Sequence, residues 1–222
     1  MVEASNGPKK DFKISPSILS LSLDEISDNI KRIENEIDFI HIDVMDGKFV
    51  LNQTDGVEMF EIAKKASKKP LDVHLMVENP AQEIKKYEGA KIITFHIEAV
   101  KNKVEALEII NTIKKMSAQV GVSIKPSTSV DILKDILEEI ELVLIMSVEP
   151  GYGGQKLIPE TLSKIEKLRE MGFNKLIEVD GGITLENAEI VRNTGVDIIV
   201  AGTAIFSSAD KIQAIQIIKG SE

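Results

Sequence analysis

The feature that most constrains the fold is a regular alternation of short apolar runs with segments of helical periodicity. Runs of strand character begin near Ile14, Phe39, Leu71, Ile92, Val120, Leu142, Leu176 and Asp197. Successive starts lie 21 to 34 residues apart, which suits one strand and its following helix. Eight such units in 222 residues, with no break in composition, predict a single α/β domain folded as a closed (β/α)₈ barrel. A doubly wound open sheet is the alternative, but the first strand–helix turn lacks the sequence G-x-G-x-x-G.

The segments between the runs carry apolar residues at the spacing of a helix face. Three such stripes are Leu23, Ile26, Ile30 and Ile33; Val104, Leu107, Ile110 and Ile113; and Leu162, Ile165 and Leu168. Ser22 is placed to cap the first of these helices, and Pro159 to begin the third. Residues 1–12 show no such pattern, so we predict a flexible N-terminal leader over 1–12 and the barrel over 13–222.

Composition limits the partners and the location. The net charge of −9 makes the chain a poor general binder of nucleic acid or anionic membranes. There is no cysteine for a disulfide or a thiolate site, no apolar run long enough to span a membrane, and no signal-peptide core. We expect a cytoplasmic protein without nucleic-acid or membrane partners. If its substrate is anionic, the protein must bind it locally, through backbone N–H groups or a few placed cations.

Polar side chains gather where the predicted strands end. In FIHIDVMDG, residues 39–47, the period of two puts His41, Asp43 and Met45 on one face of a strand. The same alternation places other polar residues together on one face near the ends of other strands: Ser15 and Ser17; Asp72, His74 and Met76; Thr94, His96 and Glu98; Glu178 and Asp180. The C-terminal ends of the strands are where a barrel of this kind builds its active site.

This concentration of polar groups indicates a metal centre. Burying so many without partners would cost several kcal/mol, which a divalent cation would offset. Imidazole and carboxylate without thiolate suit zinc, or iron, manganese or cobalt in the divalent state. The alternative is a network of buried ion pairs. Asp43 and Asp180 end the second and seventh predicted strands, so they can approach one carbon from opposite sides, one removing and one delivering a proton.

Glycine-rich loops follow the sixth, seventh and eighth predicted strands. They are EPGYGGQK at 149–156, Gly181-Gly182, and Gly202-Thr203. Glycine lets the backbone approach an anion closely, and the last two loops occupy the usual phosphate site of this fold. The first loop is long enough to move as a lid. Three methionines near strand ends, Met45, Met76 and Met146, are either core filler or a layer that keeps water from a reactive anion.

Taken in order, the motifs SPSIL, HIDVMDGKFV, DVHLMV, HIEA, MSVEPGYGGQK, EVDGGI and VAGTAIF resemble the ribulose-phosphate 3-epimerase family. The resemblance runs from Ile14 to Phe206, nearly the whole chain. It implies a (β/α)₈ barrel that interconverts D-ribulose 5-phosphate and D-xylulose 5-phosphate through an enediolate. The substrate partner is then a small phosphorylated ketose.

The resemblance also implies residue roles. One divalent metal ion, with zinc favoured, would be held by His41, Asp43, His74 and Asp180. Asp43 and Asp180 would also be the acid/base pair. Substrate would be bound by Ser17, Met45, His74, Met76, Met146, Gly151, Gly153, Gly154, Asp180, Gly181, Gly182, Gly202 and Thr203. His96 is not a ligand by this resemblance, and we expect it to pair with Glu98, either as a structural pair or as a pair that lies behind the metal ligands. By parity, Asp72 or Glu178 could orient the ligands.

The chain departs from the family pattern at two places, and rival functions stay open. Residues 49–56 read FVLNQTDG where the family commonly has FVPNITFG, and Thr203 stands in place of a serine. The nearest rival is an epimerase for a ketohexose 6-phosphate such as allulose 6-phosphate. A metal-free aldolase using Lys125 and a non-catalytic phosphate-binding barrel are others. We expect apolar loop residues such as Phe49 and Met59 to be exposed, where they would suit a partner subunit, so we expect a homo-oligomer.

Overall fold

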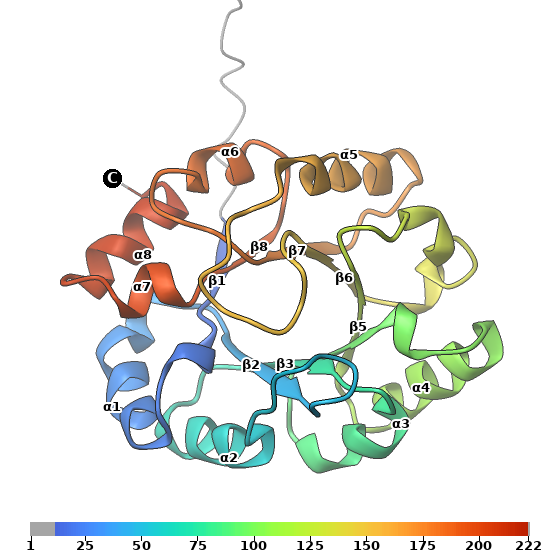
Figure 1. Cartoon of the computed structure of the whole chain (residues 1–222), viewed down its shortest axis with the longest axis horizontal. Coiled ribbons are helices and arrows are strands. Elements are labelled where there is room, and N and C mark those ends of the chain that lie inside the picture. The colour runs from blue at the N-terminus through green and yellow to red at the C-terminus, as the bar shows by residue number, and fades with distance from the viewer. Residues whose placement is uncertain (1–11, 222) are drawn as a thin grey trace, which may run out of the picture.

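The computed structural model describes residues 12–221, which form a barrel of eight parallel strands surrounded by helices (Figure 1). The strands are β1 (Lys13–Ser15), β2 (Ile40–Met45), β3 (Leu71–Met76), β4 (Ile92–His96), β5 (Gln119–Ile124), β6 (Leu142–Met146), β7 (Leu176–Asp180) and β8 (Ile198–Val200). Their order in the sheet is β1-β8-β7-β6-β5-β4-β3-β2. The predicted fold class is confirmed, and every strand begins within one residue of its predicted position. The predicted leader falls almost wholly outside the described residues, so the division at residue 12 stays a prediction.

The ring closes between β1 and β2 just beyond the end of β1. Ser17 and His41 form a parallel bridge, and the His41 N–H donates to the Pro16 carbonyl at 3.0 Å. At the other end of the seam, the Phe39 N–H donates to the Ile14 carbonyl at 3.2 Å. This closure puts Ser17 directly beside the inward-facing residues of β2.

Helices cover the outside of the barrel. They are α1 (Leu23–Ile33), α2 (Gly56–Ala66), α3 (Pro80–Glu83), α4 (Lys103–Lys115), α5 (Ser163–Glu170), α6 (Ala188–Arg192), α7 (Thr203–Phe206) and α8 (Lys211–Lys219). Single 3₁₀ turns lie at Ile18–Ser20, Glu34–Glu36, Ile84–Tyr87, Ile97–Ala99, Val130–Leu133, Leu137–Glu139 and Pro159–Leu162. Helix α1 begins as predicted, because the Glu25 carboxylate accepts hydrogen bonds from the N–H and hydroxyl of Ser22. Within residues 12–221 we find no helix long and apolar enough to cross a membrane.

Two expectations about apolar side chains were wrong. In α4 the buried face contains Ile109, Ile110 and Ile113, whereas Val104 is 66% exposed. A strict i, i+3 row drifts about 60° per step around a helix of 3.6 residues per turn, so its first member has rotated away from the core. Met59 lies in α2 and is buried, and Phe49 is half-buried. These two residues therefore do not form an exposed apolar surface for a partner subunit.

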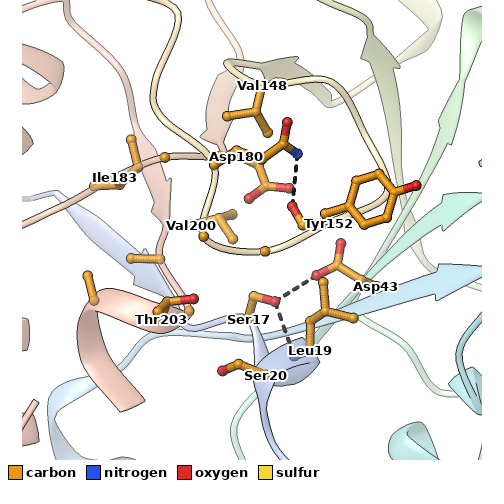
Figure 2. A pocket seen from close by; sticks show the side chains of 18 of the residues that line it. Ser17, Leu19, Ser20, Asp43, Val148, Tyr152, Asp180, Ile183, Val200 and Thr203 are labelled. Carbon is orange, nitrogen blue, oxygen red and sulfur yellow. Dashed lines mark hydrogen bonds between the residues drawn. The ribbon is translucent and has the colours of Figure 1, made fainter. Parts of the chain in front are cut away.

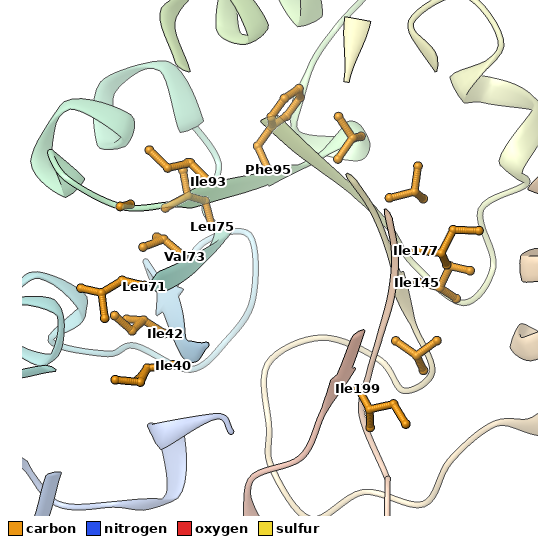
Figure 3. Close-up of a cluster of buried hydrophobic side chains, with 14 of the residues drawn as sticks. Ile40, Ile42, Leu71, Val73, Leu75, Ile93, Phe95, Ile145, Ile177 and Ile199 are labelled. Atoms are coloured by element: carbon orange, nitrogen blue, oxygen red, sulfur yellow. The ribbon is translucent and has the colours of Figure 1, made fainter. Parts of the chain in front are cut away.

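The two faces of each strand have different roles. Outward-facing side chains such as Ile42, Val73 and Ile177 pack against the surrounding helices and form the main core (Figure 3). The alternate residues, which face the interior of the barrel, include a set of fully buried polar side chains: Ser15, His41, Asp72, His74, Thr94, His96, Ser123 and Glu178. The outer core holds the barrel rigid, and the polar interior lies directly beneath the ends of the strands.

Candidate active site

A cavity of about 350 Å³ opens at the C-terminal ends of the strands (Figure 2). Many of the residues predicted from the sequence line it: Ser17, Asp43, Met45, Met76, Met146, Gly151, Gly153, Gly154, Asp180, Gly181, Gly182, Gly202 and Thr203. His41 and His74 are fully buried and approach Asp43 and Asp180 from inside the barrel. The fold therefore brings every predicted site residue to one cavity and its floor.

Four side chains at the floor form a candidate metal centre. One ligand atom from each of His41, Asp43, His74 and Asp180 lies within 4.8 Å of all the others. Asp43 Oδ1 is 3.4 Å from His41 Nε2 and 3.1 Å from His74 Nδ1, and Asp180 Oδ2 is 4.0 and 3.8 Å from the same two nitrogens. Zinc bonds of 2.0–2.2 Å would space tetrahedral ligands about 3.4 Å apart, so a small contraction around an ion suffices.

A buried atom without a partner supports the same interpretation. His41 Nε2 is buried and has no hydrogen-bond partner among the described residues. Its other nitrogen, Nδ1, lies 2.7 Å from Asp72 Oδ2, which also accepts the Ser15 hydroxyl at 3.0 Å. A proton on Nδ1 leaves the Nε2 lone pair pointing at the carboxylates of Asp43 and Asp180. The four residues therefore have the donor types and the orientation to bind a divalent cation.

The two carboxylates of this group differ in acidity. Burial would raise the pKa of Asp43, but the adjacent His41 and His74 outweigh it and hold that pKa well below its usual range. Burial and the neighbouring Asp43 carboxylate raise the pKa of Asp180 to about 6. Deeper in the barrel, burial and the Asp72 carboxylate raise the pKa of Glu178 well above its ordinary value. Two acids with separated pKa values are a usual sign of distinct proton-transfer roles.

Hydrogen bonds from two segments fix Asp43. The Ser17 hydroxyl donates to Asp43 Oδ2 at 2.6 Å, a contact visible in Figure 2. The Thr54 hydroxyl donates to the Asp43 carbonyl at 2.8 Å and accepts the Met45 N–H at 3.0 Å. The sequence analysis did not assign a role to Thr54. The signal was present, since Thr54 keeps the family residue between two positions, 53 and 55, that depart from the family pattern.

The loop after β6, residues 149–156, contributes one wall of the cavity. The Gln155 side-chain amide donates to the carbonyls of Glu149 and Tyr152 at 2.7 and 3.0 Å, which holds this loop in a compact turn. Tyr152 lines the cavity and is 53% exposed. Neither Tyr152 nor Gln155 was singled out from the sequence, although both lie inside the glycine motif that was.

The loop after β7 requires glycine for steric reasons. Gly181 and Gly182 have φ values of +115° and +69°, in the region that disfavours other residues. A Cβ atom on Gly182 would lie 2.2 Å from the Leu157 backbone nitrogen, and one on Gly181 would lie 2.3 Å from a Val148 methyl. The backbone of this loop is therefore exposed to the cavity without intervening side chains.

The rest of the cavity wall is formed mostly by apolar side chains and by backbone atoms. Other lining residues that sequence reasoning missed include Leu19, Ser20, Val148, Ile183, Thr184, Leu185, Glu186, Val200 and Ala201. Neither lysine nor arginine is found among the described residues that line the cavity. Lys125, the candidate Schiff-base residue of the aldolase alternative, instead places its Nζ 4.0 Å from the centre of the Phe49 ring. An anionic group in this cavity would be bound by backbone N–H groups and hydroxyls.

Comparisons with known proteins identify the family of this chain and support its fold. The model of the Ribulose-phosphate 3 epimerase family matches residues 13–206. The ribulose-phosphate 3-epimerase of Methanocaldococcus jannaschii is 41% identical over 210 residues, covering 92% of this chain and 88% of that protein. The Bacillus subtilis ribulose-phosphate 3-epimerase is 39% identical over 219 residues, covering 95% and 100%. A solved 3-hexulose-6-phosphate synthase from Salmonella typhimurium superposes with a TM-score of 0.72 at 19% identity, covering 94% of this chain and 97% of that one, and shows the fold alone.

Proposed function

Because the chain belongs to the ribulose-phosphate 3-epimerase family, we propose that its cavity inverts C3 of a phosphorylated ketopentose. The reaction interconverts D-ribulose 5-phosphate and D-xylulose 5-phosphate, so the enzyme is an isomerase. The observation that carries this proposal is the pair Asp43 and Asp180, which face one another across the floor of a cavity suited to a small phosphorylated sugar.

The substrate lies with its two ends at different parts of the cavity. The phosphate group binds to the backbone of the loops at Gly181–Gly182 and Gly202–Thr203, with the Thr203 hydroxyl beside it. The loop carrying Gly151, Gly153 and Gly154 covers this end. The carbon that reacts lies over Asp43 and Asp180, near Ser17. Met45, Met76 and Met146 border the reacting end with apolar side chains that exclude water.

One divalent cation would be held by His41, Asp43, His74 and Asp180. The donor set of two imidazoles and two carboxylates favours zinc, with iron, manganese and cobalt as alternatives. When bound, the cation supplies Lewis-acid stabilisation of the negative charge that develops on the substrate oxygens.

Proton transfer is the work of the two carboxylates. One of them removes the C3 proton and leaves an enediolate, and the other delivers a proton to the opposite face, which inverts the configuration. In the reverse direction the two residues exchange roles. Ser17 holds Asp43 in place through its 2.6 Å hydrogen bond, while the apolar methionines keep solvent protons away from the planar intermediate.

Proton exchange in D₂O tests the proposal. The zinc-loaded protein is incubated with D-ribulose 5-phosphate, and C3 is followed by NMR. We expect deuterium at C3 together with D-xylulose 5-phosphate, and exchange at least about tenfold slower with allulose 6-phosphate, since a difference of one carbon commonly changes kcat/KM by about 10- to 200-fold. Faster exchange with the hexulose would transfer the assignment to that substrate. Absence of exchange with both sugars would overturn the epimerase proposal.

Metal affinity should fall as the pH is lowered. The carboxylates of Asp72 and Asp43 outweigh burial and raise the pKa of His41 above its usual value, and the pKa of Asp180 is about 6. Both groups must lose a proton to act as ligands, so protons compete with the cation. Below these pKa values we expect the zinc dissociation constant to rise about tenfold per pH unit for each proton displaced. Chelator competition at pH 6, 7 and 8, corrected for the chelator's own titration, measures this. A dissociation constant independent of pH would contradict it.

The cytoplasmic location and the homo-oligomeric state expected from the sequence both stay predictions. The small phosphorylated substrate is the partner that the family supports.

A further inference from the structure

A third imidazole lies against the candidate metal centre without belonging to it. His96, the last residue of β4, is fully buried, and its Nε2 lies 2.9 Å from His74 Nε2. Its Nδ1 lies 3.1 Å from Glu98 Oε2. Neither His96 nor Glu98 is among the four ligand residues or takes part in the proton transfer proposed above. The three side chains form a continuous hydrogen-bonded row, His74–His96–Glu98.

The far end of this row determines which atoms carry protons. Glu98 Oε1 accepts two hydrogen bonds, from the Lys125 backbone N–H at 2.7 Å and from the Thr128 hydroxyl at 2.5 Å. These donors hold the carboxylate in place as an acceptor, so Glu98 Oε2 accepts a hydrogen bond from His96 Nδ1–H. A neutral imidazole with its proton on Nδ1 has a bare Nε2.

The near end of the row follows from that assignment. The bare Nε2 of His96 can only accept, so His74 donates from its own Nε2–H. His74 Nδ1 is then the nitrogen with a free lone pair, and it faces Asp43 Oδ1 and Asp180 Oδ2 at 3.1 and 3.8 Å. When both rings are neutral and Glu98 is ionised, each hydrogen bond in the row therefore has one donor and one acceptor only if Nδ1 of His74 carries no proton and is available to a cation.

We propose that His96 and Glu98 are positioning residues that hold His74 in the one neutral tautomer able to bind the cation. The inference rests on the metal centre described under the proposed function. The other imidazole ligand has a similar arrangement behind it, because His41 Nδ1 lies 2.7 Å from the Asp72 carboxylate. Both ligand imidazoles are thus linked by hydrogen bonds to a carboxylate: His41 directly to Asp72, and His74 to Glu98 through the His96 ring.

The surroundings of His96 keep water away from its ring, which is fully buried like that of His74. The Phe49 ring lies 4.8 Å from the His96 ring, and the Lys125 Nζ lies over that same phenyl ring at 4.0 Å. Hydrogen bonds are stronger in such a low-dielectric environment. Phe49 belongs to the segment 49–56, whose sequence departs from the family pattern at other positions but keeps this aromatic residue.

Three substitutions test the role of His96 through metal binding rather than turnover. His96→Phe keeps a ring but removes both hydrogen bonds, and we expect the Co²⁺ dissociation constant, measured by chelator competition, to rise about 10- to 100-fold. His96→Gln restores an acceptor near the Nε2 position and should stay within about threefold of the unmodified chain. Thr94→Val is the matched control, because Thr94 is buried on the same strand and its hydroxyl has no hydrogen-bond partner in the described structure. Circular dichroism checks that each variant is folded.

Nitrogen NMR of the zinc-loaded protein reads the tautomers directly, since the chain has only three histidines to assign. We expect the proton of His74 on Nε2 and that of His96 on Nδ1. A proton on His96 Nε2, or a His96→Phe variant that binds Co²⁺ as tightly as the unmodified chain, would overturn the role of His96 alone. If the unmodified chain itself fails to bind Co²⁺ and Zn²⁺, the metal centre of the proposed function is overturned as well.

Discussion

Asp180→Asn is expected to lower kcat for C3 epimerisation by at least about 10³-fold, near the upper part of the range for a lost general acid or base. The amide is nearly the same size as the carboxylate but cannot take up or release a proton. Asp180 is suited to the role because it lines the cavity, and because burial and the nearby Asp43 raise its pKa to about 6. Conversion of D-ribulose 5-phosphate to D-xylulose 5-phosphate in D₂O, followed at C3, measures the loss.

Comparing the two epimers separates proton transfer from metal binding. If Asp43 and Asp180 act on opposite faces, each single asparagine variant should still exchange the C3 hydrogen of one epimer while failing to interconvert them. Metal content is determined for each variant, since both residues are also candidate ligands. Asp28→Asn makes the same chemical change on the exposed face of α1 and should leave kcat unchanged. An Asp180→Asn variant with nearly full epimerase activity would exclude Asp180 as one of the two bases.

Much of this site could be predicted from the sequence because it lies at the ends of buried parallel strands. The period of two in residues 39–47 is enough to put His41 and Asp43 on the inward face, opposite Ile40 and Ile42. Strand ends of a parallel barrel converge, so residues from β2, β3 and β7 meet although they are far apart in the chain. The short apolar runs were reliable for the same reason: a strand covered by helices must be apolar on its outer face.

What could not be predicted depends on loop conformation and on contacts across the barrel. Thr54 reaches back to the backbone at Asp43, and no local pattern specifies that return. The row from His74 to Glu98 needs two neighbouring strands in a particular register, with His74 opposite Thr94 and His96 one pleat further along. Parity indicated that His96 points inward, but it could not show that its ring meets the ring of His74.

Removing the cation is expected to abolish activity and to lower stability together. Losing several kcal/mol of transition-state stabilisation corresponds to a rate loss of about 10³-fold or more. Stability falls because the buried Asp43 carboxylate then faces the partly buried Asp180 carboxylate, and His41 Nε2 has no partner among the described residues. A cation present at about 1,000 times its dissociation constant contributes about 4 kcal/mol to the free energy of unfolding. For a chain of this size that corresponds to a Tm higher by about 8–16 °C.

Thermal unfolding and initial rates are measured on the same samples, before and after dialysis against a chelator, and again after Zn²⁺ is returned. Both quantities should recover with the same dependence on occupancy, because one group of buried ligands accounts for both. Mg²⁺ should restore neither, since it prefers oxygen ligands and the centre offers two imidazoles. His41→Phe provides the matched control: this variant should show no Tm shift on adding Zn²⁺. If the stripped protein keeps its activity and its Tm, the buried group is an ion-pair network rather than a metal centre, and the two carboxylates must act without a cation.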